Sequence, residues 1–452
     1  MVRRWRRALF LLLAAALPAL LSGCMMTASV EELYALPKLP DEYRELGAQM
    51  DAILSSGGEY AAPTAGSNLQ PVQLEDLDGD GVEEAVAFFR LNSEERPLKI
   101  YIFRSVEDTY VQASVIEGSG TAVHSILYED MDHDGVKEIL VSWRVGAEVQ
   151  AMAVYALEDL EPVMLMSAAY TRYEVIDLDS DDVMELVVLR SDEAETGGTV
   201  ADYYDWDGGS LVLRSSARLS TTPAELQWVQ TGTLQGGETA LFVTGRVTGV
   251  EETSRAVTDI LTYREPDLTN IVLSSSTGVS TQISRFLNLQ PTDVNGDGIT
   301  EVPRPAELLS TAGEDTYWKI YWFSYAADGT PTQQAITYHN QADSWYLLVP
   351  DTWDTHFTVR QDSSGAAERS ATFYSVSGGT VKEPLFTIYT LTGTDREARA
   401  AKTGRSILRL QPETIYAVAF TEAYDQWRYA IDREELAGRF RPILAQWSAT
   451  DS

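Results

Sequence analysis

The feature that most constrains this chain is an acidic segment of nine residues that occurs four times, at residues 76–84, 130–138, 177–185 and 293–301. Each copy has aspartate or asparagine at positions 1, 3 and 5, valine or isoleucine at position 7, and glutamate at position 9. Position 6 is glycine in three copies and Asp182 in the other. A pattern kept at these spacings four times predicts one repeated local structure.

The chemistry of these residues indicates a calcium site. Calcium takes about six to eight oxygen ligands, mostly carboxylates and carbonyls, and acids at alternate positions of a tight loop can converge on one ion. Glycine at position 6 permits a sharp turn with positive φ, and aspartate tolerates that conformation better than most residues. We expect position 7 to give its backbone carbonyl to the ion and its side chain to the core. The predicted ligands for three to four Ca²⁺ ions are Asp76, Asp78, Asp80, Val82, Glu84, Asp130, Asp132, Asp134, Val136, Glu138, Asp177, Asp179, Asp181, Val183, Glu185, Asp293, Asn295, Asp297, Ile299 and Glu301.

The loops differ from the calcium loops of EF-hands and dockerins. Those loops need an acidic residue at position 12 and a flanking helix, whereas position 12 here is Ala87, Val141, Val188 or Arg304. Acidic turns that bind nothing remain the alternative. The fourth loop is the weakest of the set, because Pro303 and Pro305 interrupt the strand expected after it.

The spacing of the loops predicts the fold. They recur about every 50 residues, with one interval about twice as long, and each unit holds roughly four short strands. A degenerate copy at residues 231–239 lies in the long interval without the acidic ligands, so we expect no metal there. The prediction is a mainly β protein, a β-propeller-like array of about five to six four-stranded repeats. An open, solenoid-like stack is the alternative architecture.

The acidic loop at the head of a strand resembles the FG-GAP/VCBS repeats of integrin-α-type β-propellers. The resemblance covers residues 66–344 and implies calcium within the repeats and a propeller that serves as an interaction platform.

The ends of the chain lie outside the repeats. Helical spacing of apolar residues predicts a helix over 41–55. Residues 345–452 read as a small α+β C-terminal domain with helices near 395–402 and 433–447.

The N-terminus has the features of an export signal. Arginines at 3, 4, 6 and 7 precede a short apolar run over residues 8–21. The following residues, Leu21 to Cys24, resemble the lipobox of bacterial lipoproteins, which implies cleavage after residue 23 and a lipid, palmitate included, on Cys24. Residues 24–65 would then form a tether and helix, with the protein on the extracytoplasmic face of the cell membrane. An ordinary signal peptide with an incidental cysteine is the alternative.

The charge of the chain limits its partners. Net charge is −34, with 68 acidic and 34 basic residues, and such a surface repels nucleic acid. The single cysteine excludes an intrachain disulfide.

No recognisable catalytic motif accompanies the repeats, and the four histidines are scattered. We therefore expect no enzyme but a calcium-stabilised binding or scaffold module, with an extracellular protein or glycan as partner. A carbohydrate-binding or carbohydrate-processing protein is the alternative. Trp206, in an Asp- and Gly-rich turn, could stack on a sugar, although a packed hairpin tip is the simpler interpretation.

Overall fold

The computed structural model describes residues 43–107, 109–146, 150–192, 197–248, 254–310, 315–363 and 365–443. The predicted signal peptide, Cys24 and the tether up to residue 42 lie outside the described residues. Among those described, no helix combines the length and the apolar composition needed to cross a membrane.

Six antiparallel sheets follow one another along the chain, and the fold is mainly β and propeller-like. Sheet 1 contains β1 (Glu59–Tyr60), β2 (Val72–Glu75), β3 (Glu84–Arg90), β4 (Leu98–Val106) and β5 (Thr109–Gly118). Sheet 2 contains β6 (Ala122–Glu129), β7 (Glu138–Arg144), β8 (Gln150–Glu158) and β9 (Glu161–Tyr170). Sheet 3 contains β10 (Arg172–Ile176), β11 (Glu185–Ser191), β12 (Thr199–Trp206) and β13 (Leu211–Arg218).

The second half of the chain continues the series. Sheet 4 contains β14 (Leu226–Thr233), β15 (Thr239–Thr248), β16 (Ser254–Arg264), β17 (Asp267–Asn270) and β18 (Ile283–Arg285). Sheet 5 contains β19 (Val302–Glu307), β20 (Trp318–Tyr325), β21 (Pro331–Asn340), β22 (Trp345–Val349) and β28 (Phe440–Pro442). Sheet 6 contains β23 (Phe357–Asp362), β24 (Glu368–Ser377), β25 (Thr380–Thr392), β26 (Arg405–Leu410) and β27 (Thr414–Phe420).

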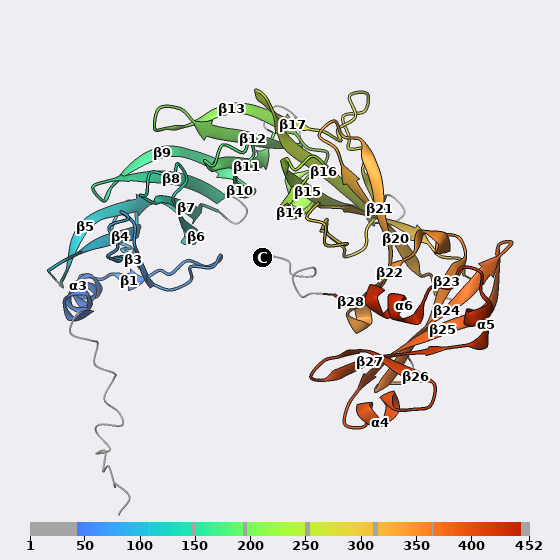
Figure 1. Ribbon diagram of the computed structural model, residues 1–452. Helices are drawn as coiled ribbons and strands as arrows, with labels where there is room; N and C mark the ends of the chain where they lie inside the picture. Colours follow the sequence, from blue (N-terminus) through green and yellow to red (C-terminus); the bar gives the residue numbers. More distant parts are fainter. Residues whose placement is uncertain are drawn as a thin grey trace, which may run out of the picture.

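The sheets are arranged around an arc, with β6, β10 and β14 nearest its centre (Figure 1). Apolar clusters fill the space between neighbours: one joins sheets 1 and 2, another joins sheets 2 and 3, and others continue the series to sheets 5 and 6. The second strand of a sheet is therefore covered on both faces. β3 is buried from Glu84 to Phe89, whereas the outer strand β5 mixes exposed and buried residues.

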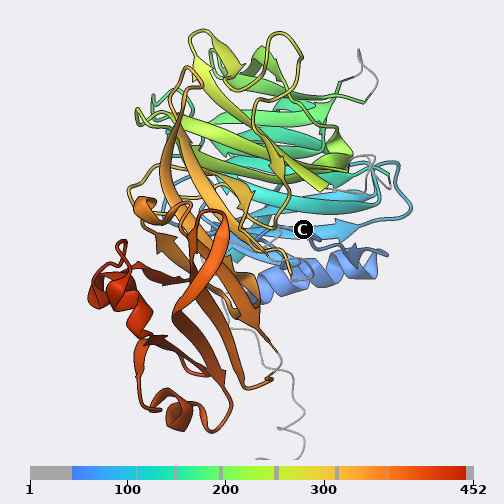
Figure 2. The same cartoon turned by 90° about the vertical axis from the view of Figure 1, so that its right-hand side faces the viewer.

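Helices cover the two ends of the arc. The helix α3 (Arg44–Ser55) places Leu46 and Met50 against Ala85, Ala87 and Phe89 of sheet 1, and it runs along that sheet in Figure 2. At the other end, α4 (Arg396–Ala400) packs Ala400 against β25 and β27. The outer faces of the first and last sheets are thus covered by helices, and among the described residues no strand of sheet 1 pairs with a strand of sheet 6.

The C-terminal region differs from the sequence-based expectation. Residues 345–349, where the separate α+β domain was expected to begin, form β22 and pair with β21 inside sheet 5. The last described helix, α6 (Arg433–Arg439), ends earlier than expected, because Phe440 enters β28 and pairs with Leu347. The remaining short helices are α5 (Glu422–Gln426) and the 3₁₀ turns at Pro223–Glu225, Gln341–Asp343 and Asp351–Trp353.

Candidate metal centres

The four acidic segments form turns that lead into the long buried strands β3, β7, β11 and the edge strand β19. In each turn, three or four carboxylates each offer an oxygen within 4.8 Å of the others. The groups are Asp76, Asp78 and Glu84; Asp130, Asp132 and Glu138; Asp177, Asp179, Asp181 and Glu185; and Asp293, Asp297 and Glu301. Positions 1 and 9, at opposite ends of the loop sequence, therefore meet in every copy.

The glutamate at position 9 is the most buried acid of each loop. Glu84, Glu138, Glu185 and Glu301 are at most 3% exposed. In each, Oε2 accepts a hydrogen bond from the backbone N–H of position 2, at 2.7–3.0 Å. The Oε1 atoms of Glu185 and Glu301 are buried and accept no hydrogen bond from the described residues. A buried carboxylate oxygen without a donor carries a large desolvation cost, which a bound cation would remove.

The pKa of these glutamates is raised from the ordinary value of 4.5. Burial is the main cause, and the neighbouring aspartates of the same loop add to it. The pKa rises to about 7 for Glu84, Glu138 and Glu301 and to about 8 for Glu185. Burial and neighbouring acids also raise the pKa of Asp132 and Asp179. Burial and the neighbouring acids of each loop therefore disfavour the ionised form of its position 9 glutamate.

The aspartate at position 1 shapes the turn. Asp76 Oδ1 accepts the N–H of Gly79 at 2.9 Å, and Oδ2 accepts the N–H of Gly81 at 3.0 Å. Asp293 repeats both bonds with Gly296 and Gly298. Position 6 has positive φ in all four loops, including 70° at Asp182, as predicted. Position 4 also has positive φ, even where it is His133 or Ser180, which the sequence pattern did not indicate.

Positions 3 and 5 are less uniform than position 1. Asp78, Asp132 and Asp179 belong to the groups, as does Asp181, but Asp80 and Asp134 at position 5 do not. The carboxylate at position 5 accepts the N–H of position 7 in all four loops, at 2.8–2.9 Å, whether or not it belongs to the group. In the fourth loop the Asn295 side chain donates from Nδ2 to Asp297 Oδ2 at 2.9 Å, so that amide already lies beside the acid group.

The prediction for the side chain at position 7 is wrong at Val82, which is 46% exposed, and Val136, Val183 and Ile299 are only partly buried. The residue that enters the core is at position 2: Leu77, Met131, Leu178 and Val294 are at most 3% exposed. Its burial fixes the N–H that holds the position 9 glutamate. The sequence pattern that indicates this buried residue is an apolar side chain at position 2, between the polar ligand residues at positions 1 and 3, in every copy.

Successive loops contact one another. The N–H of Lys137 in the second loop donates to the carbonyl of Leu77 in the first at 2.8 Å, and the N–H of Met184 in the third donates to Met131 in the second at 2.7 Å. A Cβ placed on Gly79 would lie 2.2 Å from the carbonyl oxygen of Gly135. The first three loops therefore form a continuous row.

The degenerate copy and the fourth loop are linked in the same way. The N–H of Thr300 donates to the carbonyl of Thr233 at 2.9 Å. The first three residues of the predicted degenerate copy, 231–233, belong to β14. The turn itself lies between Thr233 and Thr239, and Leu234 is buried in it. Pro303 and Pro305 do not prevent strand formation, because β19 is an edge strand that pairs only with β20 among the described strands.

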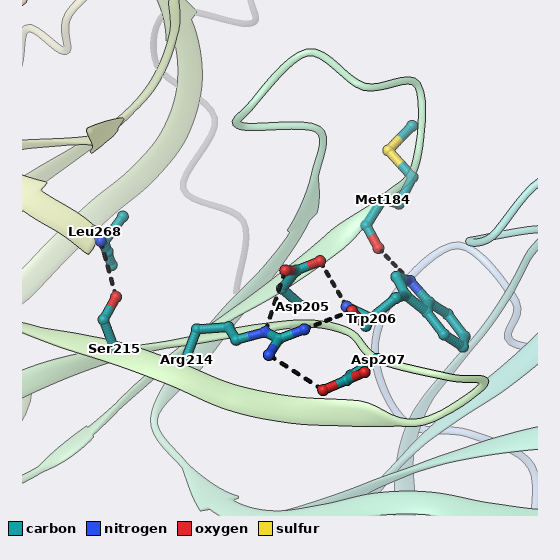
Figure 3. A network of polar contacts seen from close by, with 7 residues as sticks. All are labelled: Met184, Asp205, Trp206, Asp207, Arg214, Ser215 and Leu268. Atoms are coloured by element: carbon teal, nitrogen blue, oxygen red, sulfur yellow. Dashed lines mark hydrogen bonds and ion pairs between the residues drawn. The ribbon is translucent and has the colours of Figure 1, made fainter. Parts of the chain in front are cut away.

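Trp206 lies beside the third loop. Its Nε1–H donates to the carbonyl of Met184 at 3.0 Å, and Arg214 bridges Asp205, Asp207 and the Trp206 carbonyl (Figure 3). The indole packs partly against the apolar cluster between sheets 2 and 3. Trp206 is therefore a packed side chain at a hairpin tip in the structure.

The donor set fits a hard divalent cation: clustered carboxylates, one buried glutamate per loop, and turns whose backbone N–H groups bind the aspartates. The fold and these loops define a class, an open propeller-like array of sheets with repeated acidic turns.

No known protein family and no curated protein matches this sequence. Solved structures of low similarity include a protein from Lactobacillus plantarum, with 12% identity, a TM-score of 0.25, and coverage of 70% of this chain and 84% of that one. They also include the β-propeller domain of the Trilobed protease from Pyrococcus furiosus, at 11% identity, a TM-score of 0.25, and coverage of 71% and 91%. The periplasmic gluconolactonase PpgL of Pseudomonas aeruginosa has 11% identity, a TM-score of 0.25, and coverage of 73% and 95%.

Two of these similar structures come from enzymes, a gluconolactonase and a protease. The expectation that this chain is not an enzyme finds no support in these structures.

Proposed function

We propose that this protein is a calcium-stabilised binding module of the FG-GAP/VCBS type, displayed on the extracytoplasmic face of the cell membrane through a lipid on Cys24. The observation that supports it most is the position 9 glutamate. In four loops it is buried, held by one backbone N–H, and placed among aspartates of the same loop.

Calcium would act as a structural element in this proposal. It would relieve repulsion between the clustered carboxylates and fix the turn that leads into the buried second strand of each sheet. The row formed by the first three loops would then be rigid, and the array of sheets would present a fixed surface to an extracellular protein or glycan.

A calcium titration of the full chain tests the proposal. We expect isothermal titration calorimetry to detect three to four ions per chain, and Glu84→Gln to remove one of them. Glu83→Gln is the matched control, because it makes the same change of charge at the preceding residue, whose side chain is exposed. Absence of calcium binding to the wild-type chain, or equal effects of the two variants, would contradict the proposal.

A carbohydrate-binding or carbohydrate-processing role is the second candidate. The observation that favours it is a cavity among the inner strands of the arc, lined in part by glutamine side chains and lying away from the metal loops along those strands.

A further inference from the structure

A cavity of about 570 Å³ lies among the three innermost strands β6, β10 and β14. Its lining includes residues 124–127, 172–174 and 227–230, which belong to the first or middle part of each strand. The acidic loops and the degenerate turn follow the other ends of the same strands. The cavity is therefore separate from the candidate metal centres, and its size is typical of sites for small molecules.

The lining is rich in neutral polar groups. Four glutamines, Gln150, Gln227, Gln230 and Gln290, contribute to it, together with hydroxyl groups such as that of Tyr173. A primary amide offers both donors and an acceptor, as a ligand hydroxyl does. The Gln230 amide is held in place, because its Nε2 donates to the carbonyl of Pro291. These polar groups suit a ligand with several hydroxyls, and the apolar side chains beside them, such as Trp228, suit the C–H face of a sugar ring.

The charges of the lining balance. Arg172 and Glu174 lie two positions apart on β10 and both contribute to the cavity, and they are the only fully charged residues among the described residues that line it. His124 lies beside Arg144, with Nδ1 3.5 Å from Nη2. Burial, followed by the charges of Arg144 and Arg172, lowers the pKa of His124, which favours the neutral form of its imidazole. The lining itself carries one positive and one negative charge, and a phosphorylated or otherwise highly anionic ligand would be repelled by a chain of net charge −34.

We propose that this cavity binds a neutral saccharide, with the glutamine amides bonding its hydroxyls and Arg172 and Glu174 making charge-assisted bonds to two of them. The proposal deepens the second candidate function and is independent of calcium binding. Arginine, glutamate and amides together can address neighbouring hydroxyls as donors and acceptors. Discrimination against a ligand that lacks those hydroxyls follows from the polar groups that it would leave unpaired.

Saturation-transfer NMR and calorimetry on the full chain test the assignment, with maltotriose, cellotriose, chitotriose and lactose at millimolar concentration as probes. We expect at least one to bind, and Gln227→Ala or Arg172→Ala to weaken it about tenfold or more, the loss of one or more buried hydrogen bonds. Gln333→Ala, at an exposed glutamine of β21, is the matched control and should leave binding unchanged. Melting temperature and calcium stoichiometry, measured for every variant, report whether the fold is intact.

Three results would overturn the assignment. If none of the four saccharides binds a wild-type chain that still binds calcium, the cavity proposal fails while the calcium proposal stands. If a saccharide binds but Gln227→Ala and Arg172→Ala leave its affinity unchanged, a carbohydrate role survives at another place. If inorganic phosphate displaces the saccharide at equal concentration, the site is selective for anions.

Discussion

The backbone N–H of Met184 donates to the carbonyl oxygen of Met131 over 2.7 Å, and so joins the third acidic loop to the second. Lys137 and Leu77 join the second to the first in the same manner. Both donors immediately precede a position 9 glutamate, and both acceptors are the position 2 residues whose N–H binds such a glutamate. We therefore expect a change in one site to reach the backbone of the next.

This relationship predicts coupling between the first three sites. Glu138→Gln in the second loop should reduce calcium-dependent protection from hydrogen exchange in residues 76–84 and 177–185 as well as in its own loop. The fourth loop, 293–301, contacts the degenerate turn instead, and its protection should not change. Exchange measured by mass spectrometry resolves these peptides, and a loss confined to residues 130–138 would show that the sites act separately.

Once calcium is removed, the free energy of unfolding should decrease as the pH rises. A carboxyl whose pKa is higher in the folded chain than in the unfolded one stabilises the fold only while protonated. That contribution is present below pH 4.5 and is lost as pH rises through about 7 for Glu84, Glu138 and Glu301 and about 8 for Glu185.

The measurement is the melting temperature with EDTA at a series of pH values. It should rise as pH falls from about 8 to about 5, and excess calcium should abolish or reverse this trend, because the ion replaces the protons. At about pH 8, EDTA should lower the melting temperature substantially. A metal-free chain that is most stable at the highest pH would contradict the proposed sites.

Because the loops contact one another, alanine substitutions at two nearby glycines should differ in their effect on stability. Gly79→Ala should destabilise the chain by about 2–4 kcal/mol, since alanine there has unfavourable positive φ and its Cβ would strike the carbonyl of Gly135. Gly81→Ala is the control: φ is also positive, but no atom lies within 4 Å of the new Cβ, so about 1–2 kcal/mol is expected. Urea unfolding in the presence of calcium compares the two, and equal losses would argue against close packing of the loops.

The helix α3 should stabilise the array as a whole. Leu46 is 6% exposed against sheet 1, and Leu46→Ala should lower the free energy of unfolding by about 2–4 kcal/mol. Leu54, 36% exposed on the same helix, supplies the control, and Leu54→Ala should change stability by about 0.5 kcal/mol or less. Denaturant unfolding measures both. A neutral Leu46→Ala would mean that the helix contributes nothing to sheet 1.

The proposed lipid anchor can be tested through Cys24. In a bacterial host with a lipoprotein pathway, the wild-type chain should incorporate labelled palmitate and fractionate with membranes. Cys24→Ser should lose both the label and the membrane association, because serine lacks the thiol that would carry the lipid. Membrane retention of the serine variant would indicate another means of attachment.

The sequence predicted much of each loop because those determinants are local. Asp76 and Gly81 are separated by a few residues, and the turn between them follows from side-chain chemistry and φ alone. The role of Leu77 was missed, because its burial depends on packing between sheets. Likewise, the end of α6 is set by Leu347, which is distant in sequence and pairs with Phe440. Helical propensity of residues 433–447 carries no information about that partner.

The helices over the two outer sheets also affect how this protein can change in length. A closed ring admits only the number of sheets that its circumference allows, and an insertion would force every neighbouring angle to adjust. Here α3 and α4 cover the ends separately. A whole sheet with its acidic turn could be gained or lost by duplication or deletion while both terminal helices remained in place.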